Sequence, residues 1–173
     1  MPRIDPGLRR EDEGEDSRVG KNMEPVPPGT VALVPELEVT DFGKSLEFYV
    51  GILGFSVLYD RPERPFAYLG LGTAHIMIEK GGTWITAPLE KPLRRGMNFQ
   101  ISIPDVSALA ARLTQVGWPL FRKIEDAWYR RGAEYIGARE LLVQDPDGYL
   151  LRFSQSLGIR GISVGSGSRV RTP

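Results

Sequence analysis

The order of the whole chain follows from residues 38–57, which read Glu38-Val-Thr-Asp-Phe-Gly-Lys-Ser-Leu-Glu-Phe-Tyr-Val-Gly-Ile-Leu-Gly-Phe-Ser-Val57. This stretch predicts the end of a strand, a helix that begins after Asp41, a stop at Gly54 and a second strand. A looser copy follows, Ser102-Ile-Pro-Asp-Val-Ser-Ala-Leu-Ala-Ala-Arg-Leu-Thr-Gln-Val-Gly-Trp-Pro-Leu120. Asp41 and Asp105 are 64 positions apart, and Gly54 and Gly117 are 63 apart. The nearly constant offset indicates one strand-helix-strand unit that is used twice.

Both copies have the spacing of an amphipathic helix. Large apolar residues recur one helical turn apart in the first copy, at Phe42, Leu46, Tyr49 and Leu53. The second copy has a similar stripe, at Val106, Leu109, Leu113 and Val116. Two unrelated amphipathic helices would give the same stripes. The matching Asp and Gly caps and the strands on both sides favour duplication.

Composition excludes several classes of protein. The chain of 173 residues has no Cys, which rules out disulfides and thiolate chemistry. Lys plus Arg equals Asp plus Glu at 22 each, so no net field attracts nucleic acid or an anionic membrane. No run of 18 apolar residues exists, and the start, Met-Pro-Arg-Ile-Asp, lacks the apolar core of a signal peptide. We therefore expect a soluble, cytoplasmic protein that binds neither nucleic acid nor membrane.

The chain divides into one domain with a tail at each end. Residues 1–29 hold twelve charged residues, and such a segment cannot bury enough apolar surface to order itself. We predict a disordered charged tail over 1–29, a domain over 30–157 and a flexible Gly-, Ser- and Arg-containing tail over 158–173. A regulatory or partner-binding role for the first tail stays open. Within the domain we expect modules at 31–80 and 97–155, joined by a linker at 81–96.

Strands are predicted around each helix. In the first module they are expected at 31–39, 55–59, 66–71 and 74–80, with Pro35 making the first of them an edge, a bulge or a crossing between sheets. The second module should hold strands at 97–103, 120–124, 134–144 and 149–155. Residues 126–132, Asp126-Ala-Trp-Tyr-Arg-Arg-Gly132, are predicted to form a loop. The turn Asp145-Pro-Asp-Gly148 should join the last two strands as a hairpin.

Alternation along the strands separates an apolar face from a mixed one. Ile76 and Ile78 point one way, and His75, Met77 and Glu79 point the other way. The apolar set should lie beneath the helices, where each large side chain contributes about 1.5–3 kcal/mol. The mixed set is either the solvated side of an antiparallel sheet or the lining of a ligand cup. The residues that could line such a cup are Glu36, Tyr59, Phe66, Tyr68, Met77, Glu79, Asn98, Gln100 and Arg152.

Two motifs resemble a known family. Residues 41–55 together with Asp145-Pro-Asp-Gly-Tyr-Leu-Leu-Arg-Phe153 are similar to the vicinal oxygen chelate superfamily of glyoxalases, bleomycin-resistance proteins and ring-cleaving dioxygenases. The resemblance covers roughly residues 31–157 and implies an α+β fold. In that fold two βαβββ modules form a curved mixed sheet, with a concave cup on one side and the helices on the outer face.

The resemblance also implies four positions for metal ligands. Enzymes of the superfamily carry His or Glu at one position on the first and last strand of each module, and alignment through the motifs gives Val34, Met77, Asn98 and Arg152 here. Val has no donor atom, Met is a soft thioether and Arg repels a cation. A shift of register would bring in Glu36 or Glu79, which without an imidazole make a poor transition-metal site. His75, the only His, is interpreted as an ordinary strand residue.

Without a ligand set, the chain resembles the metal-free binders of the superfamily most closely. These are the bleomycin-resistance proteins, which sequester a bulky cationic glycopeptide, and the resemblance implies no cofactor and no catalytic residue. It implies a homodimer in which the strand beyond Val34-Pro35 is exchanged, with clefts at the subunit interface. Tyr59 and Phe66 match positions where that group has aromatic residues, and Glu36 and Glu79 would offset a cationic charge. Trp128 completes the predicted ligand contacts.

Departures from that group keep other readings open. Asn98 and Gln100 stand where the drug-binding proteins can carry Trp, and Ile136 stands before Gly137 where a Trp is common, so the ligand need not be bleomycin. The alternative function is a divergent metal-dependent glyoxalase-like lyase or ring-cleaving dioxygenase whose ligands are misaligned above. Stoichiometric metal in purified protein would favour that alternative over a binder.

Overall fold

A computed structural model describes residues 31–82, 85, 87–93 and 96–161. The predicted tail at 1–29 and the part of the second tail from residue 162 onward lie outside the described residues. The chain clusters into two units, 1–32 and 33–173, and the fold given below is that of the second. No helix in its described part is both long enough and apolar enough to cross a bilayer.

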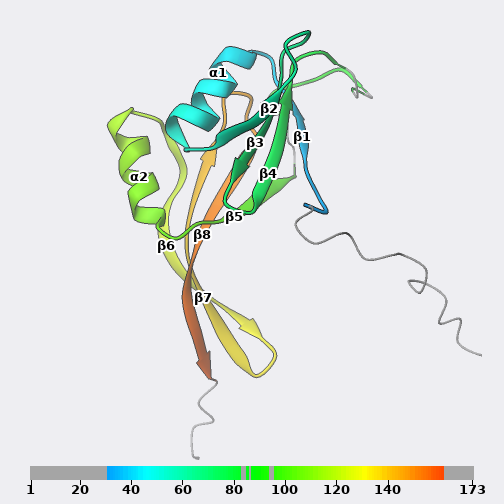
Figure 1. The fold of residues 1–173 in the computed structure, drawn as a ribbon. Helices are drawn as coiled ribbons and strands as arrows, with labels where there is room; N and C mark the ends of the chain where they lie inside the picture. Colours follow the sequence, from blue (N-terminus) through cyan, green and yellow to red (C-terminus); the bar gives the residue numbers. More distant parts are fainter. Residues whose placement is uncertain (1–30, 83–84, 86, 94–95, 162–173) are drawn as a thin grey trace, which may run out of the picture. The chain divides into compact units, whose positions relative to one another are not determined.

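The expected α+β fold of two modules is confirmed (Figure 1). The first module contains β1 (Glu36–Glu38), α1 (Phe42–Leu46), the π-helix η1 (Glu47–Ile52), β2 (Ser56–Asp60), β3 (Phe66–Leu71) and β4 (Ala74–Glu79). The second contains β5 (Asn98–Ser102), α2 (Val106–Gln115), β6 (Leu120–Arg131), β7 (Glu134–Gln144) and β8 (Leu150–Gly161). Each module forms its own four-stranded mixed sheet.

The two sheets repeat one strand order. The first sheet runs β1-β4-β3-β2 and the second runs β5-β8-β7-β6. In both, the opening strand pairs in parallel with the last strand of its module, and the other pairs are antiparallel. The duplication read from the sequence is therefore a duplication of topology.

Both helices begin and end as their caps predict. The Asp41 carboxylate accepts from the Lys44 amide at 3.1 Å, and Asp105 accepts from the amides of Ser107 and Ala108 at 2.8 and 3.0 Å. Gly54 and Gly117 follow the helices with φ of +85° and +66°, a region that favours glycine. The duplicated Asp-to-Gly frame thus fixes the length of each helix.

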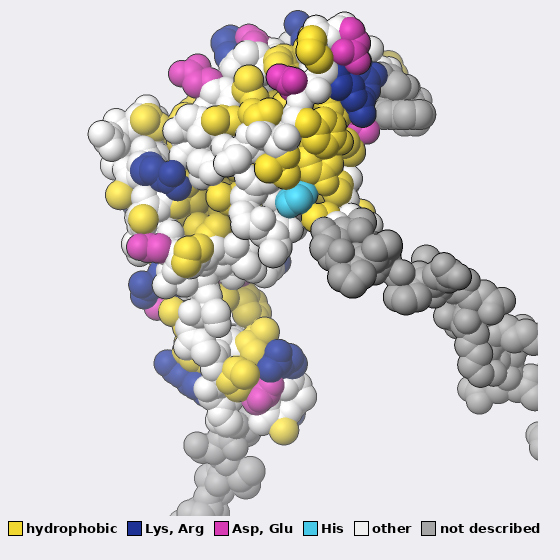
Figure 2. All heavy atoms as spheres, viewed as in Figure 1, with side chains coloured by type: hydrophobic (Ala, Val, Ile, Leu, Met, Phe, Trp, Pro, Cys, Tyr) yellow, Lys and Arg dark blue, Asp and Glu magenta, His cyan; other side chains and the backbone are white. Residues whose placement is uncertain are grey.

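Three strands of the second sheet continue beyond the core as an arm. β6 runs through residues 126–131, so the predicted loop at 126–132 is wrong, and β8 continues to Gly161, so residues 158–161 are strand. We call residues 126–138 and 156–161 the arm. It projects past α2, and basic, acidic and apolar side chains are mixed along it (Figures 1 and 2). β1, in contrast, is only three residues long, and the predicted strand at 31–39 is too long because Pro35 cannot donate to the ladder.

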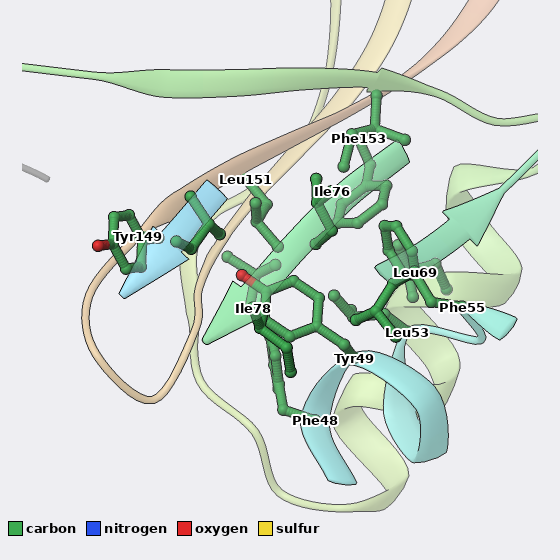
Figure 3. Close-up of a cluster of buried hydrophobic side chains, with 14 of the residues drawn as sticks. Phe48, Tyr49, Leu53, Phe55, Leu69, Ile76, Ile78, Tyr149, Leu151 and Phe153 are labelled. Carbon is green, nitrogen blue, oxygen red and sulfur yellow. The ribbon is translucent and has the colours of Figure 1, made fainter. Parts of the chain in front are cut away.

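One core joins the helices to the inner faces of both sheets (Figure 3). Ile76 and Ile78 are buried, as alternation predicts, and so are Tyr49 and Leu53 on the helical stripe. Val116 is an exception: 55% of its surface is exposed, because it caps the end of α2 and lies outside the helix.

The Asp145–Gly148 turn also ties the modules together. Asp145 accepts from the Tyr49 hydroxyl at 3.0 Å, and Asp147 accepts from the Thr40 amide and hydroxyl at 2.9 and 2.5 Å. The Lys91 ammonium lies 2.9 Å from the Asp147 carboxylate. A motif predicted only as a hairpin turn is therefore a buried contact between the two modules.

Candidate functional site

An aromatic surface covers the outward face of β2 and β3. The rings of Tyr59 and Tyr68 are stacked with centroids 4.7 Å apart and planes 18° apart, and 48% of the Tyr59 surface is exposed. The Tyr68 hydroxyl lies 3.1 Å from Nδ1 of His75 on β4. Figure 2 shows apolar side chains gathered at the surface over these strands, with basic side chains beside them. We call Tyr59 and Tyr68 the aromatic shelf.

Phe66 belongs to the same face but is covered. Only 1% of its surface is exposed, and the Arg61 guanidinium lies 3.9 Å from its ring centroid. Such a cation over an aromatic face is a favourable contact in its own right. The Phe66 ring centroid lies 5.9 Å from that of Tyr59, so Phe66 packs beside the shelf and leaves Tyr59 as the exposed ring.

Carboxylates border the shelf on β4 and β1. Glu79 is buried, and its Oε1 lies 3.1 Å from Nη1 of Arg64. Burial and the nearby Glu79 carboxylate raise the pKa of Glu36. Because Arg64 already neutralises part of this charge, the face is less acidic than the sequence suggests.

A pocket of about 450 Å³ opens beside these carboxylates. Glu36, Glu38 and Glu79 form one wall, and the linker and the chain before β5 supply an apolar wall that includes Leu89, Leu93 and Met97. Glu38 accepts hydrogen bonds from the amides of Gly81 and Gly82, between 3.0 and 3.1 Å long. The pocket can hold a small group that is apolar on one side and polar on the other.

A second polar cluster crosses the four strands of the second sheet. The Arg152 Nη2 donates to Gln100 Oε1 at 2.5 Å, and its Nη1 lies 3.7 Å from Glu140 Oε1. Glu140, 6% exposed, accepts from the Tyr129 hydroxyl at 2.7 Å, and this bond raises the pKa of Tyr129. The cluster fixes a guanidinium between an amide and a buried carboxylate.

This cluster lies in a groove of about 830 Å³. We call it the second-sheet groove, and it shares no lining residue with the pocket beside Glu36. Side chains that matter below are Gln100, Tyr129, Arg131, Ile136, Arg152 and Ile159. The polar face of each module thus carries a hollow of its own.

The structure brings the predicted ligand contacts together in two groups. Glu36, Tyr59, Tyr68, Met77 and Glu79 share the outward face of the first sheet, where Met77 pairs with Glu36 and Tyr68 across the strands. Gln100 and Arg152 meet in the second-sheet groove, and Asn98 lies exposed on the edge strand β5.

Trp128 is not placed with either group. It lies on the arm against Gly137, with the Arg160 guanidinium 3.4 Å from its ring centroid. Its surroundings are those of a ring packed within the arm.

Sequence reasoning missed Tyr129 and Glu140. The sequence predicts a loop around Tyr129, but the structure has strand there. The signal for Glu140 was present, because Ala138, Glu140 and Leu142 alternate with Leu141 and Val143, which are fully buried.

The residues present do not fit the metal that the resemblance implies. Val34 and Asn98 supply no strong ligand, Met77 is a thioether, and Arg152 carries a positive charge that Gln100 and Glu140 hold in place. Within the described residues, no three His, Cys, Asp or Glu side chains are grouped so that they could bind a metal ion.

Comparison with known proteins agrees with the fold. The model of the Glyoxalase/Bleomycin resistance protein/Dioxygenase superfamily matches residues 31–153. A probable lactoylglutathione lyase from Vibrio cholerae is 29% identical over 126 residues, which cover 69% of this chain and 86% of that protein.

Solved structures show the same architecture. TioX from Micromonospora sp. ML1 matches with a TM-score of 0.55 and 25% identity, over 72% of this chain and 98% of that one. Lactoylglutathione lyase from Agrobacterium tumefaciens matches with a TM-score of 0.50 and 17% identity, over 75% and 96%. With its duplicated modules and a family match over most of its length, this chain belongs to the glyoxalase/bleomycin resistance protein/dioxygenase superfamily.

Proposed function

We propose that this chain binds a small organic molecule without a metal ion, in the manner of bleomycin-resistance proteins. The observation that carries the proposal is the position of Arg152. Gln100 and Glu140 hold its guanidinium at a position that the resemblance assigns to a metal ligand.

Electrostatics supports this reading. A guanidinium stays protonated at any physiological pH, so a divalent cation beside Arg152 would meet a fixed like charge. Glu140, the carboxylate nearest to this position in the groove, is already engaged by Tyr129 and Arg152. No imidazole lies in the lining of the groove.

The aromatic shelf supplies the surface for a flat ring. A ligand ring stacked on Tyr59 would gain about 0.5–1.5 kcal/mol beyond the apolar area that it buries. The pocket lined by Glu36, Glu38 and Glu79 lies at the border of the same face and would suit a cationic group of the ligand. This arrangement supports a bleomycin-like ligand, which combines flat rings with positive charge.

We further propose a homodimer that exchanges an N-terminal segment. The strand after Pro35, β1, pairs with β4 within this chain, so the segment proposed for exchange is residues 31–35 instead of the strand beyond Val34-Pro35. Residues 31–35 are not part of a strand within this chain, and 82% of the Leu33 surface is exposed. An exposed apolar residue before an edge strand suits pairing with a second copy.

The second candidate function is a metal-dependent lyase. It is favoured by the 29% identity to a probable lactoylglutathione lyase. A lyase of this superfamily needs a bound metal to polarise its substrate, so the metal content of the purified protein separates the two candidates.

The proposed binding can be tested by calorimetric titration with bleomycin. We expect saturable binding, and we expect Tyr59→Ala to weaken it about 3- to 10-fold because the exposed ring of the shelf is lost. Tyr135→Ala is the matched control, since Tyr135 is an exposed tyrosine on the arm. No heat at high micromolar ligand, or equal affinity in the wild type and Tyr59→Ala, would contradict the proposal.

A further inference from the structure

Arg152 is held in place but has donors to spare. Nη2 is used by Gln100, whereas Nη1 is 3.7 Å from Glu140, which is too long for a hydrogen bond. Nε is buried and has no acceptor among the described residues. One third of the side-chain surface is exposed, at 33%. A guanidinium fixed on two sides and open on a third is prepared to donate to an oxygen that enters from the groove.

The lining of the second-sheet groove has an excess of positive charge. Among the described residues, Arg131 and Arg152 are the two cationic side chains of the lining, and Glu140 is the one anionic side chain. Arg131 also pairs with Glu134, which lies outside the lining. That pair is exposed on both sides, and such pairs contribute little, so Arg131 can turn to a ligand at small cost.

Apolar side chains extend the groove away from Arg152. Ile136 and Ile159 are paired across β7 and β8, and 60% of the Ile159 surface is exposed. On the other side of Ile136, its register partner is Tyr129 of β6. The groove therefore has a charged end and an apolar end.

We propose that the second-sheet groove binds an amphipathic organic anion. The acidic oxygens of the ligand accept from Arg152, and its apolar part lies on Ile136 and Ile159. This inference rests on the proposed metal-independent binding, and it adds a charge preference opposite to that of the pocket beside Glu36.

Two probes of the same shape separate charge from apolar contact. The anionic dye 8-anilinonaphthalene-1-sulfonate and its neutral analogue N-phenyl-1-naphthylamine share one ring system, and both fluoresce on binding. In Arg152→Gln we expect the affinity for the anionic probe to fall about 10-fold or more, because a charge-assisted hydrogen bond is lost. The affinity for the neutral probe should change less than about twofold.

Three further variants control this test. Arg139→Gln removes an arginine next to Glu140 in sequence that pairs with Asp126 and lies outside the groove lining, so it should leave both affinities unchanged. The double variant Arg152→Gln/Glu140→Gln also removes the Glu140 carboxylate, which the single variant would leave without its arginine. It should lose affinity for the anionic probe alone and keep its near-UV circular dichroism. Tyr135→Ala, which removes an exposed tyrosine of the arm outside the groove lining, should keep the preference of the wild type for the anion.

Equal loss of both probes, or an unchanged affinity for the anionic probe in Arg152→Gln, would overturn the inference. Neither result would contradict the proposed stacking of a ligand on the aromatic shelf, which is tested by titrating the wild type and Tyr59→Ala with bleomycin. A stoichiometric bound metal would instead overturn the proposed function, whatever the probes show.

Discussion

Asp145 and Asp147 lie in one turn, yet the pKa of Asp145 is raised and the pKa of Asp147 is lowered. Burial raises the pKa of Asp145 to about 6, although it accepts hydrogen bonds from Tyr149, Tyr49 and Asp147. Burial also opposes ionisation of Asp147, but its bonds from Thr40 and Lys91 outweigh that cost and lower its pKa. The turn residues could be predicted from the sequence. Their burial could not, because it depends on Thr40 and Tyr49, about a hundred positions away.

Asp145 predicts an unusual pH dependence of stability. Its pKa is about 6 in the folded state and close to 3.8 when unfolded, so the folded state binds more protons between these values. The free energy of unfolding contributed by this group should therefore fall as pH rises from about 4 to 6, by about 2–3 kcal/mol. Denaturant unfolding at each pH, compared with Asp145→Asn, isolates the contribution of Asp145. If the free energy of unfolding changes with pH in the same way in the wild type and in Asp145→Asn, the predicted contribution of Asp145 is refuted.

At the scale of the elements, the local sequence pattern predicts the bounds of the strands near the core but does not predict the strands of the arm. β3 and β7 have the predicted bounds, because alternation and turn residues mark both ends. The aromatic and basic residues at 126–131 carry no such alternation, and they form strand because β7 pairs with them. Trp128 shows the reason: its ring covers Gly137 on the neighbouring strand, and a contact between strands leaves no period in either one.

The Trp128 contact predicts a penalty for any side chain at residue 137. A Cβ built on Gly137 lies 2.6 Å from the Trp128 ring, so the ring must shift in Gly137→Ala, and its contact with the Arg160 guanidinium is disturbed. We expect a loss of about 1–3 kcal/mol in unfolding free energy, with a change in tryptophan fluorescence. Gly161→Ala is the control, since a Cβ there meets nothing within 4 Å. A cost for Gly137→Ala no larger than for this control would show that the ring is free to move.

At the scale of the whole molecule, one motif occurs twice: a helix with an Asp cap, an apolar stripe and a Gly after its end. This repeat predicts the two modules and the apolar face that each module buries. The sequence predicts one ligand cup on the mixed face, and its division into two hollows could not be predicted, because each hollow depends on side chains from several strands. Glu140, Tyr129 and Arg152 come together only once β6, β7 and β8 are in register. Likewise, the sequence showed Glu79 as an acidic residue of the face, and only the structure shows that Arg64 pairs with it.

The proposed function depends most on binding that needs no metal ion. The direct test is elemental analysis by mass spectrometry of protein purified without chelator from medium supplemented with zinc, nickel, manganese and iron. We predict less than about 0.1 equivalent of any of these metals per chain, because Arg152 puts a fixed positive charge at a position that the resemblance assigns to a metal ligand. About one equivalent of a single divalent metal, retained through gel filtration and lost with the fold intact on chelation, would contradict the account.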